Sequence, residues 1–185
     1  MWNNAIAPFF ANSSAITIIV IAWLSVYFIL SFTILLSRYL ALGVWRAKEQ
    51  SALESILIGG KIENTSSVLK KCSSSVNKEK LDVYIGLAES RSTSGLTLLA
   101  IVASTSPFIG LFGTVVGILE TFADLGDGTG GINAIARSIS EALVATGCGI
   151  FVAIPAYSFN LLIKRKAYEI LSLIKREASV LLSNK

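Results

Sequence analysis

The sequence predicts an all-α integral membrane protein with three transmembrane helices. Of its 185 residues, 53% are hydrophobic and only 15% are charged, whereas soluble proteins average about 25% charged residues. Charged side chains are absent from residues 1–37, 92–119 and 142–163. A helix needs about 20 apolar residues to cross roughly 30 Å of hydrocarbon. Three such runs leave too little polar chain to cover them in water, which disfavours a buried hairpin of a soluble fold.

The first predicted span covers residues 15–36 and follows an uncharged N-terminal segment, 1–14. A signal peptide is the alternative explanation for such a run. It is disfavoured because no basic residue precedes the run, the run is too long for a signal-peptide core, and no small-residue cleavage motif follows. The span contains no Asp, Glu, Lys or Arg, so we expect it to face lipid.

Residues 37–95 are predicted to form a cytoplasmic helical segment. Residues 45–58 mix apolar and charged side chains and end at a Gly-Gly pair, which is typical of a helix stop. The polar stretch 61–77 is expected to hold a short helix and a turn. Asn77 is a candidate N-cap for a further helix, whose apolar residues are spaced three and four apart and lead towards the second span.

Two more spans and an amphipathic tail complete the chain. We expect the second span at 96–120, an outer loop at 121–134, the third span at 135–163 and a cytoplasmic helix at 164–185. The tail pattern is typical of a solvated helix packed on a neighbour, with binding to anionic lipid as the secondary interpretation. Its apolar residues are Ile170, Leu173, Ile174 and Leu181, and its charged residues include Lys166, Glu169, Lys175 and Arg176.

The Lys and Arg residues predict the orientation. Nine lie within residues 37–95 and six lie from Lys164 onward, but none lies in 1–14 or 121–134. Cytoplasmic loops of membrane proteins are enriched in basic residues. We therefore expect the N-terminus outside and the C-terminus in the cytoplasm, with Arg137 as the one basic residue near the outer end of a span.

The composition excludes several kinds of chemistry. The chain has no histidine, and Cys72 and Cys148 lack a CxxC spacing, so neither a metal site nor a disulfide framework is expected. No nucleophile lies in a pattern with a base. We therefore expect no catalytic residues, no cofactor and no enzyme. The net charge of +4 reflects the topology of a membrane protein rather than binding to nucleic acid.

The second and third spans each carry small and hydroxyl residues on one helical face. Such faces let membrane helices approach closely, so packing is the favoured explanation for any single glycine. Gly113 and Gly117 also form a GxxxG motif. The face of the second span comprises Ala103, Gly110, Thr114, Gly117 and Thr121, and that of the third comprises Ala142, Thr146, Gly149 and Ala153.

Thr114 and Thr146 suggest more than packing, because each lies near the middle of its span. A single threonine can satisfy its hydroxyl on its own i−4 carbonyl, but two threonines on facing helices could line a polar path for a proton. Glu141, at the outer end of the third span, is a polar functional candidate. Its alternative role is an ion pair with Arg137, one helical turn away, and both roles can hold together.

The central section of each span lacks Asp, Glu and Lys. A chain that carries protons through lipid needs a titratable group there. If this protein moves protons, the protonatable carboxylate must therefore come from another polypeptide.

Two stretches resemble the ExbB/TolQ/MotA proton-channel family, and most closely its ExbB and TolQ branch of biopolymer transport proteins. Residues 103–118 read ASTSPFIGLFGTVVGI and residues 141–160 read EALVATGCGIFVAIPAYSFN. Three spans rather than four make the MotA branch a poorer match. The resemblance covers about residues 85–165 in detail and the rest in outline.

The resemblance implies a homo-oligomeric ring, a pentamer in the family, in the bacterial cytoplasmic (inner) membrane with the N-terminus in the periplasm. The ring would enclose single-span helices of an ExbD/TolR-like partner, whose intramembrane Asp takes up the proton. Thr114 and Thr146 would line the path facing that Asp, and Glu141 would be a polar residue at the outer mouth or between helices. Pro107 and Pro155 would shape their helices.

The leading hypothesis is a proton-channel subunit that couples the proton motive force to TonB-dependent outer-membrane transport or to Tol-Pal envelope function. A TonB- or TolA-like protein would then receive the work. The alternative is a structural membrane scaffold that moves no ion. The choice between an ExbB and a TolQ system stays open, and protons are favoured over sodium ions because the faces offer hydroxyls rather than a dense cage of oxygens.

Overall fold

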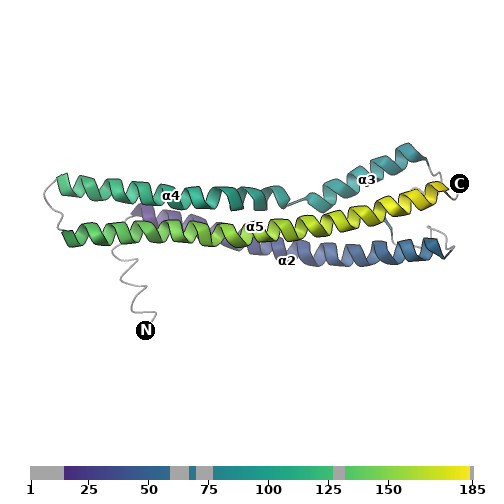
Figure 1. The fold of residues 1–185 in the computed structure, drawn as a ribbon, viewed down its shortest axis with the longest axis horizontal. Coiled ribbons are helices and arrows are strands. Elements are labelled where there is room, and N and C mark those ends of the chain that lie inside the picture. The colour runs from purple at the N-terminus through teal and green to yellow at the C-terminus, as the bar shows by residue number, and fades with distance from the viewer. Residues whose placement is uncertain (1–14, 59–66, 70–76, 127–131, 184–185) are drawn as a thin grey trace, which may run out of the picture. The chain divides into compact units, whose positions relative to one another are not determined.

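The structure is a computed structural model that describes residues 15–58, 67–69, 77–126 and 132–183. The expected outer N-terminus, Cys72 with most of the polar stretch around it, and the centre of the 121–134 loop lie outside the described residues. The described elements are four helices, α2 (Ala15–Leu57), α3 (Lys78–Thr93), α4 (Leu96–Gly126) and α5 (Ile132–Ser183), and Figure 1 shows their order along the chain.

Three helical segments of the described chain are long and apolar enough to cross a membrane. They lie in α2, in the segment that contains α4, and in α5, with mean hydropathies of 2.5, 1.8 and 1.7. This confirms the prediction of an all-α architecture with three apolar helices. Both α2 and α5 continue as unbroken helices, of 43 and 52 residues, past the ends of their predicted spans.

The junction between α3 and α4 depends on two local features. Asn77 occupies the N-cap position of α3 with an extended backbone, and its carbonyl accepts a hydrogen bond from the Leu81 amide at 3.0 Å. Its side chain makes no capping hydrogen bond, so the predicted N-cap is right in position but not in side-chain chemistry. Between α3 and α4, Gly95 has a φ of 85°, a left-handed conformation that glycine adopts without steric cost.

The chain divides into two compact units. Unit 1 comprises Met1–Thr33 and Leu98–Ser158, and unit 2 comprises Ile34–Thr97 and Phe159–Lys185. Helices α2, α4 and α5 each contribute residues to both units.

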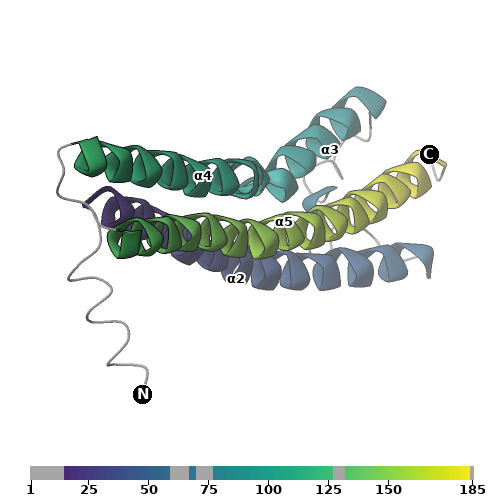
Figure 2. The same cartoon turned by 60° about the vertical axis from the view of Figure 1, so that its left-hand side comes forward.

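Unit 1 has a small apolar core formed by the N-terminal part of α2, by α4 and by the N-terminal part of α5 (Figures 1 and 2). Large side chains such as Phe108 and Phe151 remain 70% and 67% exposed, which is suited to lipid or to other chains rather than to water. The buried residues of the core are Val20, Leu24, Val102, Ala145, Val152 and Ala156.

Unit 2 has its own buried interior, built from α2, α3, the short segment 67–69 and α5. Along the tail of α5, Ile170 and Ile174 are fully buried, whereas Lys175 and Arg176 are exposed. Other buried apolar residues of unit 2 are Leu42, Ile56, Leu69, Leu81, Ile163 and Leu171.

Candidate functional site

The candidate site lies where α4 and α5 pack against each other in unit 1, and glycines allow the close approach. A Cβ atom at Gly110 would lie 2.7 Å from the carbonyl oxygen of Ala145 and 2.9 Å from the Cα of Thr146. A Cβ atom at Gly149 would lie 3.1 Å from the Cα of Gly110. The two backbones therefore touch at a point where no side chain would fit.

The glycines of the GxxxG motif lie along the same contact between α4 and α5. A Cβ atom at Gly113 would lie 3.1 Å from the Cβ of Ala145, and one at Gly117 would lie 3.2 Å from the Cβ of Ala142. The small-residue face of α4 thus packs on the small-residue face of α5 within one chain. This geometry agrees with packing as the role of these glycines.

Thr114 and Thr146 are brought together by this packing. The two Oγ1 atoms lie within hydrogen-bonding distance of each other, and both side chains are half-buried. The Thr114 hydroxyl also lies 3.1 Å from the carbonyl oxygen of Ala142 on α5 and 3.3 Å from that of Gly110 on its own helix. The site is therefore a hydroxyl pair, Thr114 and Thr146, with two carbonyl acceptors beside it.

The two hydroxyls of the pair can exchange the roles of hydrogen-bond donor and acceptor. Each threonine hydroxyl carries one donor hydrogen and two acceptor lone pairs, and either oxygen of the pair can be the donor to the other. When Thr146 donates to Thr114, the Thr114 hydrogen is free to point at the Ala142 carbonyl. A hydroxyl pair of this kind can receive or pass on a hydrogen bond without any ionisable side chain.

The remaining residues of the two predicted faces are also placed by the structure. Thr121 is 7% exposed, and its hydroxyl donates to the Gly117 carbonyl at 2.8 Å. Ala142 and Ala153 are buried, and Ala103 is packed against the core of unit 1.

Pro107 lies inside α4 and Pro155 inside α5, and both helices continue through them. Each proline removes one backbone donor from its helix, because a proline nitrogen carries no hydrogen. The backbone carbonyl one turn earlier is thereby left without its usual i→i−4 partner.

Glu141 pairs with Arg137. The distance from Arg137 Nε to Glu141 Oε1 is 3.1 Å, and the two side chains are 54% and 12% exposed. The predicted alternative for Glu141, an ion pair one helical turn away, is therefore present. Because the carboxylate is the more buried partner, it depends on Arg137 for much of its electrostatic compensation.

Asn160 on α5 was not predicted as a site residue. Its Nδ2 donates a hydrogen bond of 2.7 Å to the backbone carbonyl of Leu96, the first residue of α4. This bond fastens the beginning of α4 to α5 within unit 2. The sequence feature that could have identified Asn160 is an amide side chain between two apolar stretches of the third span.

Two buried carboxyl groups in unit 2 were also missed. Glu49 on α2 and Glu177 on α5 are both 0% exposed. Glu49 lies seven residues after Leu42 and three before Ala52, and Glu177 lies seven residues after Ile170 and three after Ile174, so each shares a helical face with buried apolar residues. A glutamate at an apolar position of an amphipathic helix was the signal that could have identified them.

Comparisons with known proteins agree with the resemblance drawn from the sequence. Residues 49–176 match the model of the MotA/TolQ/ExbB proton channel family. The chain is 38% identical over 187 residues to the Helicobacter pylori protein named biopolymer transport protein ExbB-like 1, covering 98% of this chain and 99% of that protein. The biopolymer transport protein ExbB of Xanthomonas campestris pv. campestris is 49% identical over 73 residues, 38% of this chain and 29% of that protein.

Proposed function

Because this chain belongs to the MotA/TolQ/ExbB proton channel family, we propose that it is the channel-forming subunit of an ExbB–ExbD or TolQ–TolR type complex. In this role it couples the proton motive force to TonB-dependent outer-membrane transport or to Tol-Pal envelope function. In this proposal it conducts protons and does not catalyse a reaction.

The observation that carries this proposal is the hydroxyl pair between two apolar helices. Thr114 and Thr146 meet within hydrogen-bonding distance, and the runs 92–119 and 142–163 that contain them hold no Asp, Glu, Lys or Arg. A polar group in the hydrocarbon core of a membrane is costly unless it has a hydrogen-bond partner. The pair is satisfied in the single chain, and its half-buried oxygens are positioned to accept or donate one further hydrogen bond.

A partner must supply the titrating acid. Since the central section of each span lacks Asp and Glu, the proton carrier would be an intramembrane Asp of an ExbD/TolR-like single-span protein. Movement of one charge through 100 mV releases about 2.3 kcal/mol. That energy suffices to shift a helix that slides against small side chains, and a TonB- or TolA-like protein would receive the resulting movement.

The assembly proposed for this function is a homo-oligomeric, pentamer-like ring in the bacterial inner membrane, with the N-terminus in the periplasm and the C-terminus in the cytoplasm. The extensively exposed apolar surface of unit 1 supports contact with lipid and with other chains. In this assembly Glu141 and its partner Arg137 would lie near the periplasmic mouth, where they set the local charge.

The test is proton flux through liposomes that contain the chain together with its single-span partner. Thr146→Val keeps the shape of the side chain and removes the hydroxyl. We expect flux to fall roughly tenfold or more, since loss of a stabilising hydrogen bond of about 1.4 kcal/mol changes a rate by that factor. Thr146→Ser, which restores the hydroxyl, should recover most of the flux.

Thr105→Val is the matched control. Thr105 is also on α4, but its hydroxyl donates only to the carbonyl of Ile101 in its own helix, at 2.7 Å. Its replacement should leave the flux unchanged. Full flux and full energy transfer in Thr146→Val would refute the lining role, and absence of flux in the unaltered complex would favour a structural scaffold.

A further inference from the structure

Unit 2 buries two glutamates from different helices side by side. Glu49 on α2 and Glu177 on α5 are each 0% exposed, and they are the only ionisable side chains that are buried among the described residues. Ser67 and Val68, which are adjacent in the chain, donate hydrogen bonds to Glu177 and to Glu49 respectively, so the two carboxyl groups lie near each other. We call Glu49 and Glu177 the carboxyl pair.

The polar contacts of the carboxyl pair fasten three segments of unit 2 together. Glu49 Oε1 accepts from Trp45 Nε1 at 2.8 Å and from the Val68 amide at 3.1 Å. The Ser67 hydroxyl donates to Glu177 Oε2, and its oxygen accepts from the Leu69 amide at 3.1 Å. The segment 67–69 is therefore held to α2 through Glu49 and to α5 through Glu177.

One oxygen of each carboxyl group lacks a partner. Glu49 Oε2 and Glu177 Oε1 are both buried and accept no hydrogen bond from the described residues. Two carboxylates cannot hydrogen-bond to each other, because an ionised carboxylate is an acceptor only. A single proton on one of them supplies the missing donor.

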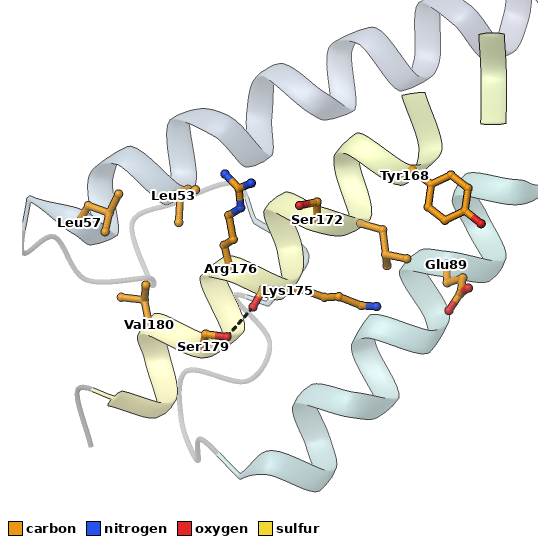
Figure 3. A pocket seen from close by; sticks show the side chains of 10 residues that line it. Leu53, Leu57, Glu89, Tyr168, Ser172, Lys175, Arg176, Ser179 and Val180 are labelled. Atoms are coloured by element: carbon orange, nitrogen blue, oxygen red, sulfur yellow. Dashed lines mark hydrogen bonds between the residues drawn. The ribbon is translucent and has the colours of Figure 1, made fainter. Parts of the chain in front are cut away.

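No cation compensates the carboxyl pair within the described part of the chain, where the ion pairs of unit 2 join Glu169 to Arg46 and to Arg165. Lys175 and Arg176 immediately precede Glu177 in the sequence, but both are exposed and line a pocket of about 720 Å³. Figure 3 shows Arg176 extending from α5 towards α2 and Lys175 extending towards α3.

The helices around the carboxyl pair also keep their charges outside. On α2, Arg46, Lys48 and Glu54 are exposed. All charged side chains of α3 are exposed as well, and α3 contributes Leu81 and Ala88 to the interior. Among the residues that the structure describes, the polar groups that contact the pair are the Trp45 indole, the Ser67 hydroxyl and the Val68 amide.

We propose that Glu49 and Glu177 form a proton-binding site in unit 2, distinct from the hydroxyl pair of unit 1, in which one shared proton holds α2, α5 and the segment 67–69 together. Loss of this proton would leave two buried negative charges in contact. The pair would then separate or admit water, and the segment 67–69 would be released.

The raised pKa of Glu177 is consistent with the buried position of the carboxyl pair. Burial raises the pKa of Glu177 from its ordinary value of 4.5 to about 8, with the neighbouring Glu49 adding to the increase and the Ser67 hydrogen bond opposing it. Between pH 4.5 and about pH 8 the folded chain keeps a proton that the unfolded chain loses. The free energy of unfolding therefore falls as pH rises through this window and levels off above it.

Infrared spectroscopy of the full chain in lipid nanodiscs tests the proposal directly. At pH 7 we expect the carbonyl band of a protonated carboxyl group, and we expect the band to disappear on titration with a midpoint near pH 8. Glu177→Gln should lose this band while keeping the fold, because the amide can supply the same hydrogen bond. Glu49→Gln should retain the band but shift its midpoint to lower pH, since Glu49 raises the pKa of Glu177.

Glu89→Gln is the matched control, because Glu89 is an exposed glutamate of unit 2. The band should be the same in this variant as in the unaltered chain. Absence of a protonated-carboxyl band at pH 7, or a band of equal intensity in Glu177→Gln, would overturn the proposal. The titration of the unaltered chain decides the question even if a variant does not fold.

Hydrogen exchange tests the consequence for the segment 67–69. Above pH 8 its amides should exchange faster in the unaltered chain than in Glu177→Gln at the same pH, since only the former then has two charges in contact. Equal exchange in both chains would refute the release of the segment. A thermal stabilisation by Mg²⁺, Ca²⁺ or Mn²⁺ that Glu177→Gln abolishes would also overturn the shared proton, by showing that a metal ion is the ligand.

A prediction for the pH dependence of proton flux rests on the proposed function. If the chain conducts protons with its partner, flux should decline above pH 8 on the side of the membrane where unit 2 lies, and Glu177→Gln should remove that decline. Absence of flux in every variant would refute the channel function and leave the infrared result intact. Flux with the same pH dependence in both chains would refute only this regulatory step.

Discussion

Gly110 on α4 and Gly149 on α5 pack backbone against backbone, so closely that a Cβ atom on Gly149 would lie 3.1 Å from the Cα of Gly110. The contact places the small-residue faces of two apolar helices directly on each other. It also sets the register in which Thr114 and Thr146 meet. The glycines therefore determine the geometry of the hydroxyl pair without contributing any polar group to it.

Gly110→Ala should destabilise the chain by about 1–3 kcal/mol, the usual cost of forcing extra atoms into a packed contact. The added methyl group would collide with the backbone of α5, 2.7 Å from the Ala145 carbonyl oxygen. Gly147→Ala is the control, because a Cβ atom there meets nothing within 4 Å. Thermal unfolding in detergent micelles, followed by circular dichroism, should show a lower Tm for Gly110→Ala alone; equal Tm values would contradict the close contact.

Gly95→Ala and Gly86→Ala should have opposite effects on stability. Gly95 has a φ of 85°, where an alanine costs roughly 1–2 kcal/mol. Gly86 lies inside α3 with nothing within 4 Å of a Cβ position, so alanine there should stabilise the helix by up to about 1 kcal/mol. The same unfolding measurement compares the two variants. A Gly95→Ala chain as stable as Gly86→Ala would show that the junction tolerates another conformation.

Arg137→Ala should destabilise the chain more than Glu141→Gln. Removing Arg137 leaves a carboxylate that is only 12% exposed without its partner, whereas glutamine at position 141 keeps polar atoms and carries no charge. A double-mutant cycle of these two substitutions should give a coupling free energy of about 0.5 kcal/mol that decreases with added salt. A coupling of zero would mean that the ion pair does not contribute to stability.

Ser67→Ala should shift the titration of the carboxyl pair to higher pH. The Ser67 hydroxyl donates to Glu177 and stabilises its charged form, so its loss raises the pKa of Glu177 further. Ser179→Ala is the control, because that exposed hydroxyl donates only to the Lys175 carbonyl of its own helix, at 3.1 Å. Infrared titration should give a higher midpoint for Ser67→Ala alone. A lower midpoint would refute the assigned hydrogen bond.

The three apolar helices could be predicted from the sequence because a membrane span is a property of local composition. The charge-free runs at 92–119 and 142–163 need no tertiary information to be recognised. The faces of α4 and α5 could also be predicted, since a helix of 3.6 residues per turn fixes which residues share a side. The contact between Thr114 and Thr146 was only partly predictable, because the relative register of two helices depends on packing between them.

The pairing of Glu49 with Glu177 could not be predicted with the same rules, although the helical position of each glutamate was a signal of its burial. Glu49 and Glu177 lie far apart in the sequence, and each stands in a stretch with other charged residues, where a glutamate is usually solvated. Only the packing of α2, α5 and the segment 67–69 buries them together. Burial of an acid against another acid is a tertiary property, and composition does not record it.

The hydrogen bond between Thr114 and Thr146 has a direction, because at any moment one oxygen donates and the other accepts. A proton relayed along such a pair would leave both O–H bonds pointing the opposite way. Each hydroxyl would then have to swing about its C–O bond before a second proton could follow the first. In the proposed complex, that rotational reset would limit the relay to one proton for each reorientation of the two hydroxyls.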